Sequence, residues 1–126
     1  MMRRRLKFGS RPWRHLTSAE KQQLQPYIAQ VDLDSALLHE AGVPWYLGER
    51  FVAVTRGHRI YFRIGAYDAS MIEGIALLGH ELVHVGQYRL GMTALHYLTA
   101  ARRGYRTNPY EQVAFALGDR IRADLA

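Results

Sequence analysis

The longest stretch with a hydrophobic pattern lies between residues 71 and 90. Within it the only fully charged side chains are Glu73, Glu81 and Arg89. A segment of this length that is apolar on nearly every side predicts a buried helix. Ser70 and Glu73 have the S-x-x-E spacing of a capping box, and Gly91 is suited to the position that follows a helix, so the helix is expected to begin near residue 71 and end near residue 90.

Before this helix the pattern is typical of strands. Residues 51–55 and 58–64 are rich in β-branched and aromatic side chains, and Arg56-Gly57 separates them, which predicts a β-hairpin with these two residues in its turn. A third strand is expected near residues 35–40, although the surrounding residues 31–41 also fit a helix.

Three further helices are expected, over residues 17–25, 92–103 and 109–123. Thr17 and Glu20 form a capping box before the first. Gly104 is suited to end the second. Asn108 and Pro109 are suited to the N-cap and N1 positions of the third.

These elements predict an α+β fold with a small antiparallel sheet. The expected order is an N-terminal helical segment, about three strands including the hairpin at 51–64, a buried helix, and two further C-terminal helices. The chain has 126 residues, which suits one domain, here placed at residues 15–126.

Composition separates a basic N-terminal tail from a neutral body. The net charge is +6, and residues 1–14 hold six basic side chains and no acid. Such a tail is expected to be mobile and solvated; it leaves nucleic-acid binding open, but no nucleic-acid motif accompanies it. The sequence has neither an apolar run of about 20 residues nor the apolar region of a signal peptide, so a cytoplasmic protein without a membrane span is expected.

The buried helix carries the chemistry in His80-Glu81-Leu82-Val83-His84. On a helix, His80 and His84 lie one turn apart on the same face, where both can bind one zinc ion. Glu81 lies beside them and can take a proton from water that the metal activates, which is the reason why HExxH indicates a zinc hydrolase. The alternative is that the histidines are hydrogen-bonded core residues. The chain has no cysteine, so a third ligand must be His, Asp or Glu.

Five residues are candidates for that third ligand: Glu111, His96, His58, Asp68 and Asp119. Glu111 is favoured because small residues on its helix face, such as Ala114 and Gly118, would let another helix come close. Gly79 and Gly86 on the motif helix would allow the same approach. The alternative is that Glu111 only completes a capping box with Asn108.

The motif together with the helix start at Asn108-Pro109-Tyr110-Glu111 resembles the gluzincin branch of zinc metallopeptidases. It is similar to compact bacterial HExxH domains of poorly defined function, in which the helix continues into a glutamine, here Gln87. The resemblance implies one zinc ion per chain, held by His80, His84 and Glu111, with Glu81 as the general base. Phe115 departs from the pattern, because larger gluzincins often have an aspartate there to orient a histidine. Only a different geometry would let Asp119 replace it.

The leading hypothesis is therefore a zinc-dependent metallopeptidase that cleaves a peptide or protein substrate. The substrate is expected to lie along a free edge of the hairpin as an added strand. The candidates for stabilising the oxyanion are Tyr97, Tyr105, Tyr110 and His96. The alternatives are a non-catalytic zinc-stabilised interaction module and, on the tail alone, a basic nucleic-acid binder.

Overall fold

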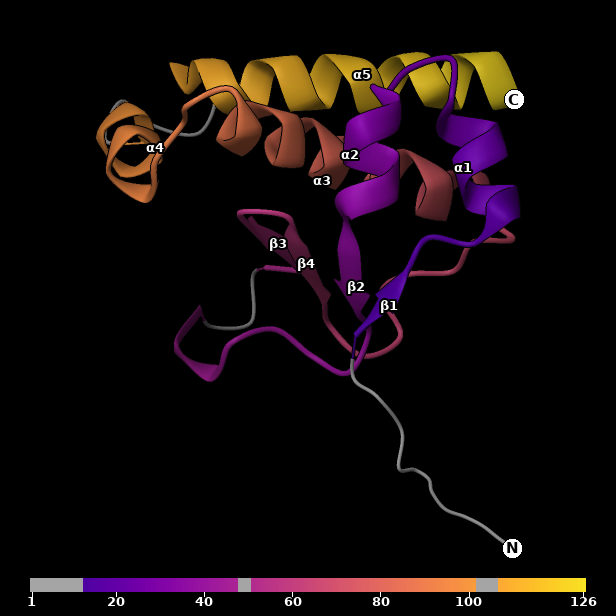
Figure 1. Ribbon diagram of the computed structural model, residues 1–126, viewed down its shortest axis with the longest axis horizontal. Coiled ribbons are helices and arrows are strands. Elements are labelled where there is room, and N and C mark those ends of the chain that lie inside the picture. Colours follow the sequence, from indigo (N-terminus) through magenta and orange to yellow (C-terminus); the bar gives the residue numbers. More distant parts are fainter. Residues whose placement is uncertain (1–12, 48–50, 102–106) are drawn as a thin grey trace, which may run out of the picture.

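A computed structural model describes residues 13–47, 51–101 and 107–126. The elements, in chain order, are β1 (Arg14–His15), α1 (Ser18–Leu24), α2 (Gln30–Ser35), β2 (Leu37–His39), a 3-10 helix (Trp45–Leu47), β3 (Ala53–Arg56), β4 (Arg59–Phe62), α3 (Ile72–Arg89), α4 (Ala94–Ala101) and α5 (Pro109–Leu125). Helices α3 and α5 lie side by side, α1 and α2 pack against α3, and α3 covers the sheet (Figure 1). The predicted α+β class is confirmed.

The sheet is mixed, with strand order β1-β2-β4-β3. Strands β1 and β2 are antiparallel, as are β3 and β4, whereas β2 and β4 are parallel. The prediction of an antiparallel sheet is therefore wrong at the central pair. The chain leaves β2, forms β3 at the far edge and returns as β4, which places β4 beside β2 in the same direction.

The hairpin is confirmed, but its turn lies one residue later than expected. Arg56 pairs with Arg59, so Gly57 and His58 are the two turn residues. Gly57 has a φ of +66°, in the left-handed region that the first turn position of this kind of hairpin requires. The glycine therefore determines where the turn falls.

Residues 31–41, whose pattern fits either a strand or a helix, contain the end of a helix followed by a strand. Helix α2 ends at Ser35 and β2 begins at Leu37. Other helix boundaries follow their predicted caps. Thr17 and Glu20 form the capping box of α1, and the Asn108 side chain accepts a hydrogen bond from the Tyr110 N–H at the start of α5. The predicted stop at Gly104 lies outside the described residues.

Helix α3 does not use the predicted capping box. Met71 is at the N-cap and makes no side-chain cap bond. The Ser70 N–H and hydroxyl bind Asp68 Oδ1 at 2.9 and 2.6 Å instead. The loop carbonyl of Asp68 lies so close to the first turn that a Cβ on Gly74 would be 1.8 Å from it. At the other end, Gly91 adopts a φ of +117° and follows the helix as predicted.

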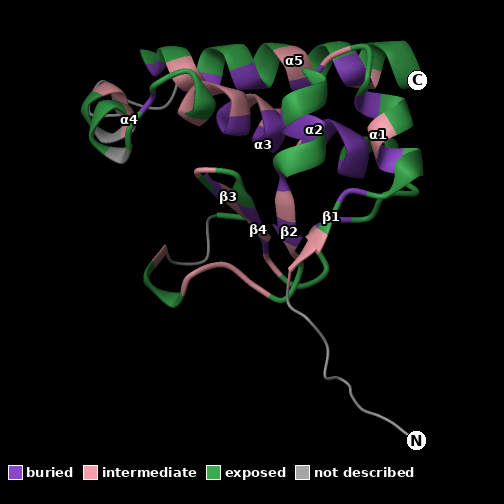
Figure 2. Ribbon diagram, in the orientation of Figure 1, coloured by how far each residue is buried: buried purple, intermediate pink, exposed green. Residues whose placement is uncertain are grey.

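The core lies between the sheet and α3. Leu38, Ile60 and Phe62 are fully buried on the sheet, and Leu78 and Leu82 are fully buried on the helix. Figure 2 shows the buried residues along α3 and on the faces of α1, α2 and α5 that point toward it. The motif helix is therefore the centre of the fold, as its apolar sequence predicted.

Trp13 and Arg14, which the prediction placed in the tail, contact the folded part of the chain. Trp13 packs against His39 and Tyr61, with ring centroids 4.9 Å apart in both pairs. Arg14 lies in β1 and forms an ion pair with Glu20 at 2.9 Å. Arg14, assigned to the tail by its charge, is therefore part of β1, and Trp13 directly precedes it. The rest of the predicted tail, residues 1–12, lies outside the described residues.

Among the described residues, no helix combines the length and hydrophobicity needed to cross a membrane.

Candidate metal centre

His80, His84 and Glu111 form a cluster of potential metal ligands. The Nε2 atoms of His80 and His84 each lie 3.0 Å from Glu111 Oε1. One ligand atom from each of the three side chains lies within 4.8 Å of the others. The predicted third-ligand candidate Glu111 is therefore the residue that the fold brings to the motif histidines.

The close packing of α5 on α3 brings Glu111 to this place. A Cβ on Gly79 would lie 2.4 Å from Ile121 Cδ1, so this glycine makes room for a side chain of α5. Gly118 on α5 faces the Ala76 carbonyl, which would be 3.6 Å from an added Cβ. The predicted approach through small residues is confirmed at these positions. Gly86 has a different neighbour, since its Cβ would meet Asp32 of α2 at 3.0 Å.

Gln87 orients the second histidine. Its Oε1 lies 2.7 Å from His84 Nδ1, and its Nε2 donates to the Tyr110 carbonyl at 3.1 Å. The amide is thus anchored at the start of α5, with its oxygen toward the imidazole. An Nδ1–H that donates to Gln87 leaves the lone pair of Nε2 for a metal ion. The sequence alone did not identify Gln87 as the residue that holds the second ring nitrogen of His84.

The carboxylate of Glu111 is also fixed. The Tyr97 hydroxyl of α4 donates to Oε2, so Oε1 faces the two histidines. Burial raises the pKa of Glu111, but the hydrogen bonds with the histidines and Tyr97 outweigh it and hold that pKa far below its usual range. Burial lowers the pKa of His84, yet the hydrogen bond with Glu111 and the nearby carboxylates raise it overall.

Glu81 lies beside the ligands. Its Oε2 is 3.9 Å from His80 Nε2, and its Oε1 accepts a hydrogen bond of 2.8 Å from the Thr55 hydroxyl of β3. The residue is 5% exposed, and burial raises the pKa of its carboxyl. A carboxylate with a raised pKa is a stronger base than an exposed one, which suits proton transfer near neutral pH. Thr55 was not identified from the sequence.

The other candidates from the sequence lie elsewhere or in other roles. His96 is exposed and Asp119 pairs with Arg122 at 2.9 Å, and neither joins the cluster, nor do His58 and Asp68. Phe115 stands at the position where larger gluzincins often have an aspartate. Its ring packs edge-on against His80, with ring centroids 4.6 Å apart. Among the oxyanion candidates, Tyr105 lies outside the described residues.

Tyr110 and Tyr97 are neighbours at the centre. Their ring centroids are 6.4 Å apart, and the Tyr97 ring is 6.0 Å from that of His84. The backbone carbonyl of Tyr110 holds Gln87. Both tyrosines therefore act on the ligands, one through Glu111 and one through Gln87.

The donor set fits a divalent metal ion. Two imidazole nitrogens and one carboxylate oxygen make up the protein ligands of many catalytic zinc sites, with a fourth position left for water. His84 has a hydrogen-bond partner on its other nitrogen, as a ligating histidine usually does. The three side chains could therefore hold one metal ion.

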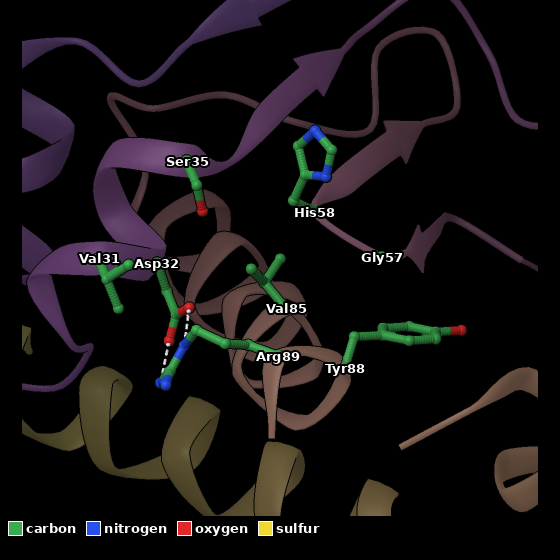
Figure 3. A pocket seen from close by; sticks show the side chains of 8 residues that line it. All are labelled: Val31, Asp32, Ser35, Gly57, His58, Val85, Tyr88 and Arg89. Atoms are coloured by element: carbon green, nitrogen blue, oxygen red, sulfur yellow. Dashed lines mark hydrogen bonds and ion pairs between the residues drawn. The ribbon is translucent and has the colours of Figure 1, made fainter. Parts of the chain in front are cut away.

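A separate hollow lies at the C-terminal end of α3. It has a volume of about 460 Å³. Arg89 in its wall forms two hydrogen bonds to the Asp32 carboxylate, at 2.7 and 3.0 Å, and Tyr88 and His58 lie on its other sides (Figure 3). None of His80, His84 and Glu111 lines this hollow. Arg89 and Asp32 pair with each other, and this ion pair joins α2 to the end of α3.

Comparison with known proteins gives one partial match. A family model described as the eCIS core domain matches residues 50–92. The match spans the hairpin and α3, so it includes His80, Glu81 and His84 and ends before Glu111. No curated protein and no solved structure gives a significant match.

Proposed function

We propose that this protein is a zinc-dependent peptidase of the gluzincin type. The observation that carries the proposal is the convergence of both Nε2 atoms on Glu111 Oε1, with a buried carboxylate 3.9 Å from one of them. Three ligands and an adjacent base are the parts that metal-assisted hydrolysis requires. They are contributed here by α3 and α5, which pack tightly against each other.

Zinc bound by these residues would polarise the scissile carbonyl and lower the pKa of water at the open position. Glu81 would accept the proton of the attacking water and pass it to the leaving amine. The buried setting of Glu81 supports this role, because it raises the pKa of the carboxyl and so strengthens the base.

Tyr97 is better suited to holding Glu111 than to stabilising an oxyanion. Its hydroxyl proton is donated to Glu111 Oε2, which keeps Oε1 toward the metal position. Tyr110, Tyr105 and His96 remain the candidates for a donor to the oxyanion.

The substrate is proposed to add to β3 as an extra strand. β3 is the outermost strand of the described sheet, next to β4 alone. The hairpin has a two-residue turn, so Arg56 and Arg59 form the hydrogen-bonded pair that closes it, and the next pair, Thr55 with Ile60, is non-hydrogen-bonded. At that position the N–H and C=O of Thr55 point toward the open edge. An extended peptide could pair with them beside Glu81.

The test is the Glu81→Gln variant, which keeps the shape of the side chain and removes the base. Hydrolysis of a peptide library should fall by about 10²- to 10⁴-fold, while the zinc content stays at the parent level. Glu73→Gln is the matched control, since Glu73 lies on the same helix with a 72% exposed side chain. A Glu81→Gln variant as active as the parent would contradict the proposal.

A second candidate function is a non-catalytic, zinc-stabilised interaction module. The burial of the ligands favours it, because the side chains of His80, His84 and Glu111 are only 12%, 7% and 8% exposed. A structural zinc site is closed by four protein ligands, whereas a catalytic site keeps one position for water. X-ray absorption spectroscopy of the zinc-loaded protein would distinguish them: three protein ligands and a water support the peptidase, and four protein ligands support the module.

A further inference from the structure

Thr55 is the polar member of an otherwise apolar row. The residues of β2, β3 and β4 that face α3 are Leu38, Ala53, Thr55, Ile60 and Phe62, as the alternation along each strand and the pairing of Thr55 with Ile60 show. Thr55 is 7% exposed. Valine has nearly the same shape and would fill this position without a hydroxyl.

A buried hydroxyl is costly unless it is hydrogen-bonded. The Thr55 Oγ1 lies 2.8 Å from Glu81 Oε1 and 3.2 Å from the Glu81 backbone carbonyl. It has one proton to donate, and the shorter contact goes to the carboxylate. Both contacts go to Glu81, the residue beside the metal ligands, and within the described part of the chain the hydroxyl is directed at that residue.

We propose that Thr55 is a positioning residue for Glu81, an inference that rests on the proposed role of Glu81 as the general base. The hydrogen bond fixes Oε1 and leaves Oε2 on the side of His80, 3.9 Å from its Nε2. A buried carboxylate held at one oxygen presents the other in a single orientation. This arrangement places the free oxygen where a proton from the attacking water would be accepted.

The same residue connects the base to the substrate strand. Its backbone groups lie in the plane of the sheet and point toward the open edge of β3, whereas its side chain is perpendicular to the sheet and points to α3. Replacing the side chain keeps the backbone groups available for peptide pairing. Removal of the Thr55 hydroxyl should therefore lower kcat and leave KM almost unchanged.

The experiment compares Thr55→Val and Thr55→Ser in the zinc-loaded protein. Thr55→Val should lower kcat by about tenfold to a hundredfold, which is the cost of a misplaced reacting group, without a change in KM or zinc content. Thr55→Ser restores the hydroxyl and should recover most of kcat. Thr99→Val is the matched control, because its hydroxyl is exposed on α4 and bonds the Leu95 carbonyl of the same helix.

The outcomes separate this inference from the proposed function. If Glu81→Gln is inactive but Thr55→Val keeps the parent kcat, the inference is overturned and the peptidase proposal stands. If Glu81→Gln keeps its activity, or the parent cleaves no peptide, the proposed function fails. Crystal structures then decide the inference: a Glu81 side chain displaced in Thr55→Val supports it, and the same Glu81 conformation in both proteins overturns it.

Discussion

At the scale of single residues, the centre depends on side chains that hold the ligands as much as on the ligands. Gln87 bridges His84 and the Tyr110 carbonyl with bonds of 2.7 and 3.1 Å. Loss of such a partner releases the imidazole to rotate and to change tautomer. Partners of this kind usually contribute 10- to 100-fold to metal affinity.

Gln87→Met should therefore weaken zinc binding by about 10- to 100-fold with little change in fold. Competition with a chromogenic chelator measures this affinity. Gln22→Met, at an exposed position of α1, is the control and should bind zinc like the parent. Equal affinities for Gln87→Met and the parent would show that His84 does not depend on the amide.

The motif was predictable at this scale, but its partners were not. His80, Glu81 and His84 are related by the helical repeat, so their spacing alone places them together. Gln87 and Thr55 act through contacts with α5 and with β3, and such contacts depend on how distant elements pack. Glu111 was predictable in part, because the small residues around it indicated a close helix approach.

At the scale of elements, the contact between α3 and α5 sets the distance between Glu111 and the histidines. Gly79 is the tightest point, where an added Cβ would lie 2.4 Å from Ile121 Cδ1. Gly118 on the facing helix has only ordinary contacts, the nearest at 3.6 Å. The two glycines therefore respond differently to the same substitution.

Gly79→Ala should lower the free energy of unfolding by about 1–3 kcal/mol through overpacking, as urea denaturation would measure. Gly118→Ala should be neutral or stabilising by up to about 1 kcal/mol, since alanine favours the helix. Ile121→Val removes the clashing Cδ1 and should restore part of the stability of Gly79→Ala. Equal effects of the two glycine substitutions would contradict this account of the helix contact.

Glu20 joins β1 to α1 and predicts a pH dependence. Burial raises the pKa of Glu20, but hydrogen bonds from Arg14, Tyr67 and the Thr17 N–H outweigh it and lower that pKa from 4.5 to about 2. Because the pKa is lower in the folded state, the stabilisation is complete above pH 4.5 and is lost as the pH falls toward 2.

Glu20→Gln should therefore lower the free energy of unfolding at pH 7 by about 3 kcal/mol, with the difference from the parent shrinking between pH 4.5 and 2. Denaturation at a series of pH values measures this. Glu40→Gln removes the 45% exposed partner of Arg14 and should change the free energy by less than about 1 kcal/mol. A Glu20→Gln difference that stays constant down to pH 2 would contradict the assignment.

The elements were predictable where local chemistry defines them. The caps at Thr17 and Asn108 and the glycine at residue 91 mark helix ends in the sequence as they do in the structure. Ser70 misled the prediction because its hydroxyl bonds Asp68 in the preceding loop. The parallel pairing of β2 with β4 has no local signal, since it depends on the path of the chain between them.

At the scale of the whole molecule, a bound metal would join the two helices on which the fold is built. Helix α3 is the centre of the core, and α5 is the C-terminal helix packed along it (Figure 1). An ion held by His80 and His84 from one helix and Glu111 from the other binds the folded state and not the unfolded chain. Its binding free energy therefore adds to folding.

Zinc at 100 times its Kd should raise the free energy of unfolding by about 2.7 kcal/mol, and a chelator should reverse the gain. Thermal unfolding across a zinc titration measures this, with the rise expected to follow the logarithm of the free zinc concentration. His84→Ala is the comparison and should lose most of the response. A Tm in the parent that does not depend on zinc would contradict a site built from α3 and α5.

The most direct test of a metal centre formed by His80, His84 and Glu111 is the zinc content per chain. It is measured by elemental analysis of the purified protein and of Glu111→Ala after incubation with zinc and removal of the excess. About one zinc ion per chain is expected in the parent. Much less is expected in a Glu111→Ala variant whose circular dichroism matches that of the parent. No zinc in the parent, or full retention in Glu111→Ala, would contradict the three-ligand centre of His80, His84 and Glu111.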